Sequence, residues 1–287
     1  MSQIQIVTDS TADIPEHLTK ELGITVIPLK VTFDQKETYR DGENLSPEQF
    51  YEKLPQYESV PTTSQPTPYE FETVFERLRE RNGEETQVFS IHLSSQMSGT
   101  YQAATIAAGE VAEKIEVEVV DSKKASYSLG IIVVMLAQYA REGHSFEECK
   151  KKLDELLEDT NVYFMVDTLQ YLQKNGRIGK ASALIGSLLK MKPILSVNEE
   201  GQVYPYDKAR GKKKAVAKIL SAIEEGYKNT PVHIGISHAV AEETAKEIAV
   251  QIQEKFDVKS EVITKIGAVI GSHVGPGTVS IAVTKAE

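Results

Sequence analysis

Residues 88–108, VFSIHLSSQMSGTYQAATIAA, decide the fold class of this chain. Residues 88–93 are rich in β-branched and aromatic side chains, which predicts a short strand. A loop of small hydroxyl-bearing residues follows at 94–100, and the alanine-rich stretch beyond it predicts a helix. A strand that leads into a helix in this way is typical of a parallel sheet with helices packed on its faces.

The same alternation of strand and helix extends on both sides of this unit. Residues 3–7 predict an opening strand, and Pro15 predicts a helix over 16–22 because proline favours the first helical turn. Residues 117–120 predict a further strand, with another helix after it. We therefore expect a mostly parallel sheet flanked by helices up to about residue 125.

Proline residues mark the segments between these units. Pro28 interrupts the β-rich residues 24–33, which predicts an edge strand or a bent strand. Ser46 and Thr67 each precede a proline and have a glutamine or glutamate three residues on, which is the pattern of a capping box. We expect a helix to begin after each of these two hydroxyl residues.

After an expected helix at 147–159 the pattern changes, and strands become more frequent. This mix predicts a second α/β domain, so we place an N-terminal α/β domain at residues 1–160 and a C-terminal α/β domain at 161–287. The elements expected after the boundary are strands at 162–166, 193–197, 202–206, 232–237, 260–264 and 279–283, with helices at 212–227 and 241–256.

The composition excludes several classes of protein. The chain has 32 Lys and Arg against 42 Asp and Glu, and its net charge of -10 argues against nucleic acid as the main partner, which needs a cationic surface. This average hides one basic segment, residues 174–218, which holds 11 of the basic residues and only 3 acidic ones. We expect an acidic protein whose surface still offers one cationic segment.

The distribution of cysteine and of apolar residues predicts a compartment. Cys149 is the lone cysteine, which rules out an internal disulfide and fits a reducing environment. The longest apolar run, residues 129–137, is about half of the roughly 18 residues that a membrane helix needs. Residues 1–7 lack the basic segment of a signal peptide. We expect a soluble, cytoplasmic protein with no integral membrane segment.

Motifs of common enzymes and cofactor-binding proteins are absent. The chain has no G-x-x-x-x-G-K-[ST] phosphate loop, no G-x-G-x-x-G fingerprint and no H-E-x-x-H zinc motif. We therefore expect no bound cofactor and no metal site.

Two weaker patterns leave an enzymatic alternative open. Gly235-Ile-Ser237-His238-Ala nearly matches the G-x-S-x-G motif of serine hydrolases but ends in alanine, and we prefer the interpretation that Ser237 or His238 caps the next helix. Asp9 and Asp13 flank a strand-to-helix turn, where a phosphotransferase places its carboxylates. Their spacing is wider than such chemistry expects, and Asp9 is also a good cap.

Two hydroxyl-rich loops point more clearly to a ligand. Residues 61–66, PTTSQP, precede one expected helix, and residues 94–100, SSQMSGT, follow a strand at its carboxyl end. Ligands of open α/β sheets lie at the carboxyl ends of the strands, and hydroxyls together with free helix amides bind small anions there. The loops predict a carboxylate or phosphate site, or else a pair of helix caps with no ligand.

Three further segments could contribute to an anion site. Gly176 and Gly179 flank Arg177 in a stretch without acidic residues, and glycine permits close approach of the backbone to a ligand. Arg210 lies in the basic run 208–214, which is either a solvated face or a contact surface. His273 lies in GSHVGPG, which predicts a glycine-rich loop before the last strand.

Taken together, these segments resemble the DegV family of bacterial fatty-acid-binding proteins, and the resemblance covers essentially the whole chain. Each motif is short, but their order and spacing are specific. The matching motifs are Ile6-Val-Thr-Asp-Ser10, Thr63-Ser-Gln-Pro66, Ser94-Ser95 with Ser98-Gly-Thr-Tyr101, Asp121-Ser122, Gly176-Arg-Ile178, Lys208 to Lys214 with Arg210, and Gly271-Ser-His273 with Gly275-Pro-Gly277.

The resemblance implies a two-domain α/β protein that holds one long-chain fatty acid, such as palmitate or oleate. Carried over by motif, Thr63 and Ser95 would hydrogen-bond the fatty-acid carboxylate, with Ser94 as the adjacent candidate. Arg177 and His273 would stand near the same head group, and Arg210 would help to dock a partner. The carboxylate-binding loops would belong to the N-terminal domain, and the lipid pocket and the partner-binding segment to the C-terminal domain.

In the family that partner is a fatty-acid kinase, which phosphorylates the bound lipid to an acyl phosphate for phospholipid synthesis. Because this chain has no nucleotide-binding motif, it resembles the lipid carrier subunit and not an enzyme. A serine hydrolase acting on acyl esters, with Ser95 or Ser237 as nucleophile and His238 or His273 as base, is the alternative. Apolar residues within 184–194 are material for a lipid tunnel or for ordinary helix core.

Overall fold

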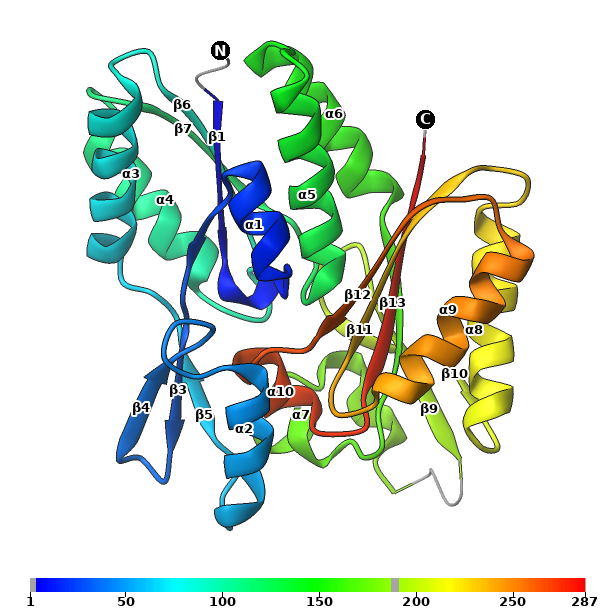
Figure 1. Ribbon diagram of the computed structural model, residues 1–287. Coiled ribbons are helices and arrows are strands. Elements are labelled where there is room, and N and C mark those ends of the chain that lie inside the picture. Colours follow the sequence, from blue (N-terminus) through cyan, green and yellow to red (C-terminus); the bar gives the residue numbers. More distant parts are fainter. Residues whose placement is uncertain (1–3, 187–190, 287) are drawn as a thin grey trace.

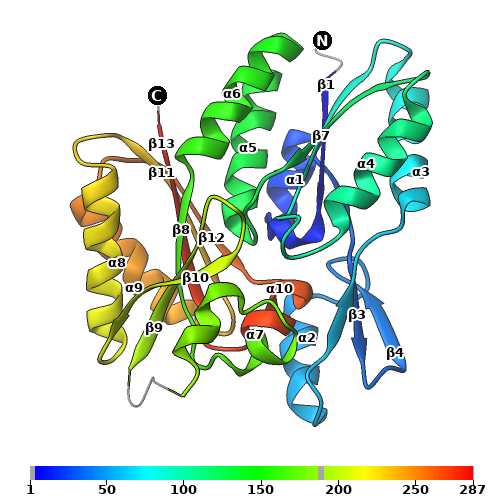
Figure 2. The same ribbon diagram turned by 180° about the vertical axis from the view of Figure 1, so that it is seen from behind.

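The computed structural model describes residues 4–186 and 191–286 of the chain. It contains two large sheets and one small sheet with helices around them, and Figures 1 and 2 show it from two opposite sides. This mixed α/β architecture, with a parallel sheet flanked by helices and a second α/β unit, confirms the predicted fold class.

The first large sheet is entirely parallel, as the strand–helix alternation predicts. Its strands follow the order β2-β1-β6-β7. They are β1 (Ile4–Asp9), β2 (Thr25–Ile27), β6 (Gln87–His92) and β7 (Glu116–Asp121). Five α-helices surround this sheet (Figure 1), namely α1 (Glu16–Leu22), α3 (Pro68–Asn82), α4 (Thr100–Val111), α5 (Tyr127–Arg141) and α6 (Phe146–Asp159).

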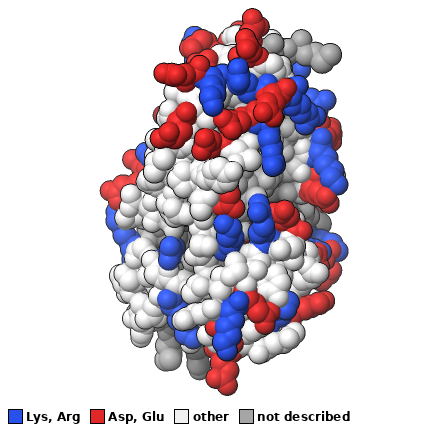
Figure 3. Space-filling model, turned by 90° about the vertical axis from the view of Figure 1, so that its left-hand side faces the viewer, with Lys and Arg blue, Asp and Glu red and all other residues white. Residues whose placement is uncertain are grey.

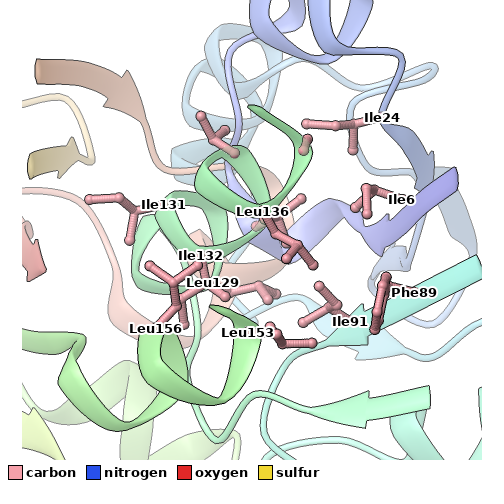
Figure 4. Packing of buried hydrophobic residues seen from close by; sticks show 14 of the residues in the cluster. Ile6, Ile24, Phe89, Ile91, Leu129, Ile131, Ile132, Leu136, Leu153 and Leu156 are labelled. Atoms are coloured by element: carbon pink, nitrogen blue, oxygen red, sulfur yellow. The ribbon is translucent and has the colours of Figure 1, made fainter. Parts of the chain in front are cut away.

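Alternate residues of these strands point to opposite faces of the sheet, as the strand period requires. Ile6, Phe89 and Ile91 pack against α5 and α6, where Leu136 and Leu153 complete a buried cluster (Figure 4). The neighbours of these strand residues pack on the other face against α3 and α4. Because both faces are covered, most residues of the central strands β1 and β6 are buried.

Pro28 divides the β-rich residues 24–33 into two strands of different sheets. Strand β2 ends at Ile27 and is an edge strand of the parallel sheet, which agrees with the prediction. Strand β3 (Lys30–Phe33) instead pairs with β4 (Glu37–Arg40) and with β5 (Thr62–Ser64) in a small antiparallel sheet. Thr63 therefore lies in a strand, and the prediction of a loop at this position was wrong, because pairing with a distant strand is not encoded locally.

The predicted capping boxes are confirmed at both helix starts. Ser46 and Thr67 accept hydrogen bonds from the amides three residues on, and the Gln49 and Glu70 side chains accept from the cap amides in return. They begin α2 (Pro47–Lys53) and α3, and a short 3-10 helix, η2 (Leu54–Gln56), continues α2.

The second large sheet is formed by the C-terminal half of the chain. Its order is β10-β9-β8-β13-β11-β12, and the pairing is antiparallel except between β11 and β12. The strands are β8 (Asn161–Met165), β9 (Lys192–Val197), β10 (Val203–Ala209), β11 (Val232–His238), β12 (Val258–Lys265) and β13 (Val279–Lys285). Helices α8 (Lys212–Gly226) and α9 (Glu242–Lys255) pack on one face of this sheet.

The other face of the second sheet is turned toward the first half of the chain, where helix α5 packs on it (Figure 2). Gly235 on β11 lies directly under the ring of Tyr127, and a side chain at this position would overlap that ring. The glycine of the Gly235-Ile-Ser237 motif therefore makes room for helix α5.

Helix α10 (Ala268–Val274) joins the two halves of the structure. The carboxylate of Asp41 accepts hydrogen bonds from the amides of Ala268 and Val269, and Asp13 accepts one from Gly267. Buried apolar residues of α10 pack with β3 and α2 in one cluster. His273 thus lies in a helix, and the prediction of a glycine-rich loop was wrong because these contacts from distant residues cap and bury the segment.

The remaining elements are a short helix and two 3-10 helices. They are α7 (Gln170–Lys174), η1 (Ser10–Ala12) and η3 (Gly179–Leu184). Over the described ranges, no helix is long and apolar enough to cross a membrane.

Candidate functional site

A cavity of about 320 Å³ lies between the second large sheet and the helices and loops of the first half of the chain. Most of its wall is apolar. The apolar lining residues are Leu29, Leu93, Met97, Ala125, Val162, Phe164, Leu172, Val197, Val203, Ile266, Val269, Ile270 and Val274. The polar lining residues are Thr63, Ser64, Gln65, Ser98, Ser126, Arg177, His273, Thr278 and Ser280. A pocket of this composition suits a ligand with a long apolar part and a small polar group.

Thr63 and His273 form the polar centre of one end of the cavity. The Thr63 Oγ1 atom lies 2.9 Å from the His273 Nε2 atom, although the two residues are 210 positions apart in the sequence. Burial, helped by the nearby Arg177 guanidinium, lowers the pKa of His273 to about 4. The imidazole is therefore neutral near pH 7, and it offers a hydrogen-bonding group without a charge.

Arg177 marks the place where this end of the cavity opens to solvent. Its side chain is exposed and lines the cavity. The Nε atom donates to the carbonyl of Met97 at 3.1 Å, and Nη1 donates to the carbonyl of Asn175 at 2.6 Å. A cation held beside the opening favours an anionic ligand group there.

Asn175 positions the two partners of the polar centre. Its Nδ2 atom donates to the carbonyl of Pro61 at 3.1 Å, two residues before Thr63, and to the carbonyl of Ser272 at 2.8 Å, next to His273. One amide side chain therefore ties strand β5, helix α10 and the segment after α7 together. The sequence analysis missed Asn175, since an asparagine at the end of a short helix carries no local signal of this role.

The two hydroxyl-rich segments meet at this end of the cavity. Gln65 follows Thr63 and packs on Gly99, where a Cβ atom would lie 2.5 Å from Gln65 Oε1. Ser98 lines the cavity beside them. The sequence analysis found the two segments, but within the second one it selected Ser95, whereas Ser98 is the residue that lines the cavity. Ser98 carries the same signal as Ser95, a small hydroxyl residue after a strand.

Ser94 and Ser95 do not line the cavity as it stands. The buried Ser94 hydroxyl donates to the carbonyl of Gly201 at 2.7 Å and so joins the two halves of the structure. The half-buried Ser95 donates its amide to Asp121 Oδ1 at 3.1 Å, and its hydroxyl makes no hydrogen bond with any described residue. Of these two serines, Ser95 is thus the one whose hydroxyl is not engaged by another described residue.

Arg210 lies apart from the cavity, on the surface. It is exposed between β10 and α8, beside Gly211, which takes a φ of 85° at the turn into the helix. The three lysines 212–214 open helix α8 next to it. Figure 3 shows the opposite side of the molecule, which lies on the left in Figure 1 away from α8, and there basic and acidic side chains are intermixed.

The serine-hydrolase motif is not assembled as a catalytic site. Ser237 is buried, and its hydroxyl lies 3.0 Å from that of Ser126. The His238 Nδ1 atom accepts from the amide of Ala241 at 3.4 Å, but Ala241 is itself the N-cap residue of helix α9 and no described side chain caps the helix, so the predicted cap at Ser237 or His238 was wrong. In the described part of the chain no histidine contacts the hydroxyl of Ser95 or Ser237.

A Ser–His–Asp array is nevertheless present at another place, which the sequence analysis missed. The Ser90 hydroxyl lies 2.7 Å from His92 Nε2, and His92 Nδ1 lies 3.0 Å from Asp9 Oδ2. All three side chains are fully buried, so a substrate cannot reach the hydroxyl. Asp9 also accepts from the Thr11 amide and caps η1, as predicted.

Carboxylates are not arranged for metal binding. Among residues 4–186 and 191–286, no group of three or more His, Cys, Asp or Glu side chains is placed to hold a metal ion.

Of the apolar residues proposed for a tunnel, Leu188 and Leu189 lie outside the described residues, and Leu184 packs in a buried cluster near the cavity.

Comparison with known proteins gives consistent matches over the whole chain. A family model described as "Uncharacterised protein, DegV family" matches residues 3–286. A DegV domain-containing protein of Listeria monocytogenes is 42% identical over 79% of this chain and 78% of its own. A solved structure titled as fatty acid binding of a DegV family protein, from Thermus thermophilus, is 34% identical with a TM-score of 0.91 and covers 99% of both chains. A structure titled as DegV, a fatty acid binding protein from Bacillus subtilis, is 37% identical with a TM-score of 0.89 and covers 100% of both chains.

Proposed function

Because this chain belongs to the DegV family, we propose that it binds one long-chain fatty acid, such as palmitate or oleate, in the cavity described above. The observation that carries the proposal is the composition of the cavity wall, which is mostly apolar and includes a polar group where Thr63 and His273 meet, with Arg177 beside it. An acyl chain gains about 0.8 kcal/mol for each CH₂ group that it buries. Its carboxylate needs hydrogen-bond donors, because an unpaired buried charge is very costly.

We place the carboxylate against the hydroxyls of Thr63 and Ser95. Thr63 is held in place by its contact with His273, and the Ser95 hydroxyl has no competing partner among the described residues. The Ser94 hydroxyl is already bonded to Gly201, which favours Ser95 over its neighbour. A small rotation of the loop after β6 would turn Ser95 toward the cavity, as ligands often induce at binding loops.

The neutral partners suit a carboxylate that must still react. Hydroxyl groups and an uncharged imidazole stabilise the carboxylate without a direct ion pair, so its oxygen keeps its nucleophilic character. We propose that the protein is a carrier and not an enzyme, and that it presents this oxygen to a fatty-acid kinase. The oxygen would attack the terminal phosphorus of a phosphoryl donor held by the kinase, and the bond from that phosphorus to the rest of the donor would break, so that the donor leaves one phosphoryl group shorter and an acyl phosphate forms for phospholipid synthesis.

Arg210 is the proposed contact to the kinase. It is exposed, lies outside the cavity, and belongs to the basic segment 174–218 that also contains Arg177 at the cavity opening. Positive charge near the opening would help to neutralise the phosphoryl group during its transfer.

Native mass spectrometry of the freshly purified protein tests the core of this proposal. We expect a complex whose mass exceeds that of the chain by one fatty acid, and the lipid released on denaturation identifies its length. Protein that emerges without lipid and does not take up added palmitate or oleate would contradict fatty-acid binding.

A further inference from the structure

The cavity has a second polar region, formed by serines of three different elements. Ser126 precedes helix α5, Ser280 lies on β13, and both line the cavity. Ser237 on β11 stands directly opposite Ser280 in the antiparallel pairing of the two strands. Residues opposite each other in such a pair project to the same face of the sheet, so the three hydroxyl groups gather at one place.

Two of these hydroxyls are bonded to one another and to a buried carboxyl group. The Ser126 hydroxyl donates to Asp13 Oδ2 at 2.6 Å and lies 3.0 Å from the Ser237 hydroxyl. Burial raises the pKa of Asp13 well above its usual range, although the Ser126 hydroxyl and the Gly267 amide both donate hydrogen bonds to this carboxyl group. Asp13, Ser126 and Ser237 therefore form a polar chain that ends at the cavity wall.

The backbone of Ser126 is strained. Its φ of 55° and ψ of -152° lie in a region that residues other than glycine rarely adopt. Such a conformation persists only where surrounding contacts impose it, and strained residues concentrate at functional sites. The bonds to Asp13 and Ser237 hold Ser126 in this position against the cavity.

The Ser280 hydroxyl has no partner in the described residues. The residue is only 6% exposed, and the accessible part of its side chain faces the cavity. A buried hydroxyl normally finds a hydrogen-bond partner, because leaving it unpaired is unfavourable. Ser280 therefore offers both a donor and an acceptor to whatever fills the cavity.

Asp13, which anchors the serine cluster, and His273 lie at opposite ends of helix α10. Asp13 contacts the amide of Gly267 at the start of helix α10, whereas His273 lies near the end of that helix. The rise of an α-helix over these positions is about 9 Å. The Asp13 end of the serine cluster is thus separated along this helix from the pair of Thr63 and His273.

We propose that this cavity takes a fatty acid that carries a hydroxyl group along its chain, with that hydroxyl bonded to Ser280 beside Ser126. The inference rests on the proposed fatty-acid binding and adds a substrate class to it. An unsubstituted chain leaves Ser280 unpaired, whereas a chain hydroxyl pairs with it and is itself satisfied.

A displacement assay with stearate and its 9-, 10-, 12- and terminally hydroxylated derivatives tests this inference. For the wild-type protein we expect at least one positional isomer to bind more tightly than stearate. In Ser280→Ala that preference should fall about tenfold, because one hydrogen bond is lost and the ligand hydroxyl is left unpaired. Ser196→Ala is the matched control, since Ser196 is also a buried strand serine but bonds to the carbonyl of Val162 and does not line the cavity.

The outcomes separate the two proposals. Tight binding of stearate with weaker binding of every hydroxylated isomer would overturn the hydroxyl site and leave fatty-acid binding intact. Failure of all these lipids to bind would overturn both. An equal preference in Ser280→Ala and the wild type would also refute the role of Ser280. The wild-type ranking needs no variant, so it decides the matter even if Ser280→Ala does not fold.

Discussion

Replacing Thr63 by valine removes one hydroxyl group and keeps the shape and β-branching of the side chain. In the structure this hydroxyl is 2.9 Å from His273 Nε2 and lines the polar end of the cavity. Strand β5 should persist, because valine favours strands at least as much as threonine does. The variant therefore isolates the hydrogen bond to the fatty-acid carboxylate.

The size of the effect follows from the charge of the ligand. A hydrogen bond to a charged group is worth about 1.5–3 kcal/mol, which corresponds to roughly a 10- to 150-fold change in Kd. We expect Thr63→Val to fall within that range, with an added contribution from the loss of the His273 contact. Thr63→Ser keeps the hydroxyl and should restore most of the affinity.

Displacement of a fluorescent fatty acid by palmitate measures these affinities directly. Thr62→Val is the matched control, because Thr62 is the preceding residue of the same strand, is exposed and does not line the cavity. We expect its Kd to equal that of the wild type within a factor of two. A Thr63→Val protein that binds palmitate as tightly as the control would refute the assignment of Thr63 to the carboxylate.

Four further predictions concern His273, Gly235 and Arg210. Because the pKa of His273 in the folded protein is about 4, palmitate affinity should not vary between pH 5.5 and 8, as titration of binding would show. The unfolded chain takes up a proton on His273 near pH 6.5, whereas the folded chain does so only near pH 4. As the pH falls from 6.5 to 4, the free energy of unfolding of the wild type should therefore decrease relative to that of His273→Gln, as denaturant titrations would show. Gly235→Ala forces a methyl group into the ring of Tyr127 and should destabilise the protein by about 1–3 kcal/mol, and an unchanged urea midpoint would contradict this packing. Arg210→Ala should leave the palmitate Kd unchanged and slow kinase-dependent formation of acyl phosphate. The control is Arg81→Ala, at an exposed position on α3, which should affect neither quantity. An equal rate of acyl phosphate formation for the two variants would argue against docking at Arg210.

Much of the fold could be predicted because its signals are local. The capping boxes at Ser46 and Thr67 depend on residues three positions apart, and both were found as predicted. The parallel sheet followed from strands that lead into helices, since that order of elements permits few other arrangements. The two elements that were wrong, at Thr63 and His273, are a short strand and a short helix that contacts from distant segments stabilise.

The sequence predicted the kinds of chemical group in the candidate site but not all of the residues that form it. The hydroxyl-rich segments and Arg177 were recognised from the sequence, and Thr63, Arg177 and His273 do line one cavity. Asn175 and Ser126 carry no local signal, because an amide or a hydroxyl near a helix end is usually a cap. Their roles depend on carbonyl and carboxyl groups more than 90 residues away.

The sequence by itself determined most of the strands and helices, the helix starts at Ser46 and Thr67, and the kinds of polar groups in the candidate site. These depend on backbone preferences and hydrogen bonds within a few residues, which a local pattern encodes. Only the tertiary structure decided that Thr63 meets His273, 210 residues away, and that Ser280, which makes no hydrogen bond through its hydroxyl within the described residues, lines the same cavity. Both depend on how the two large sheets pack around a shared space, and packing is a property of the whole chain.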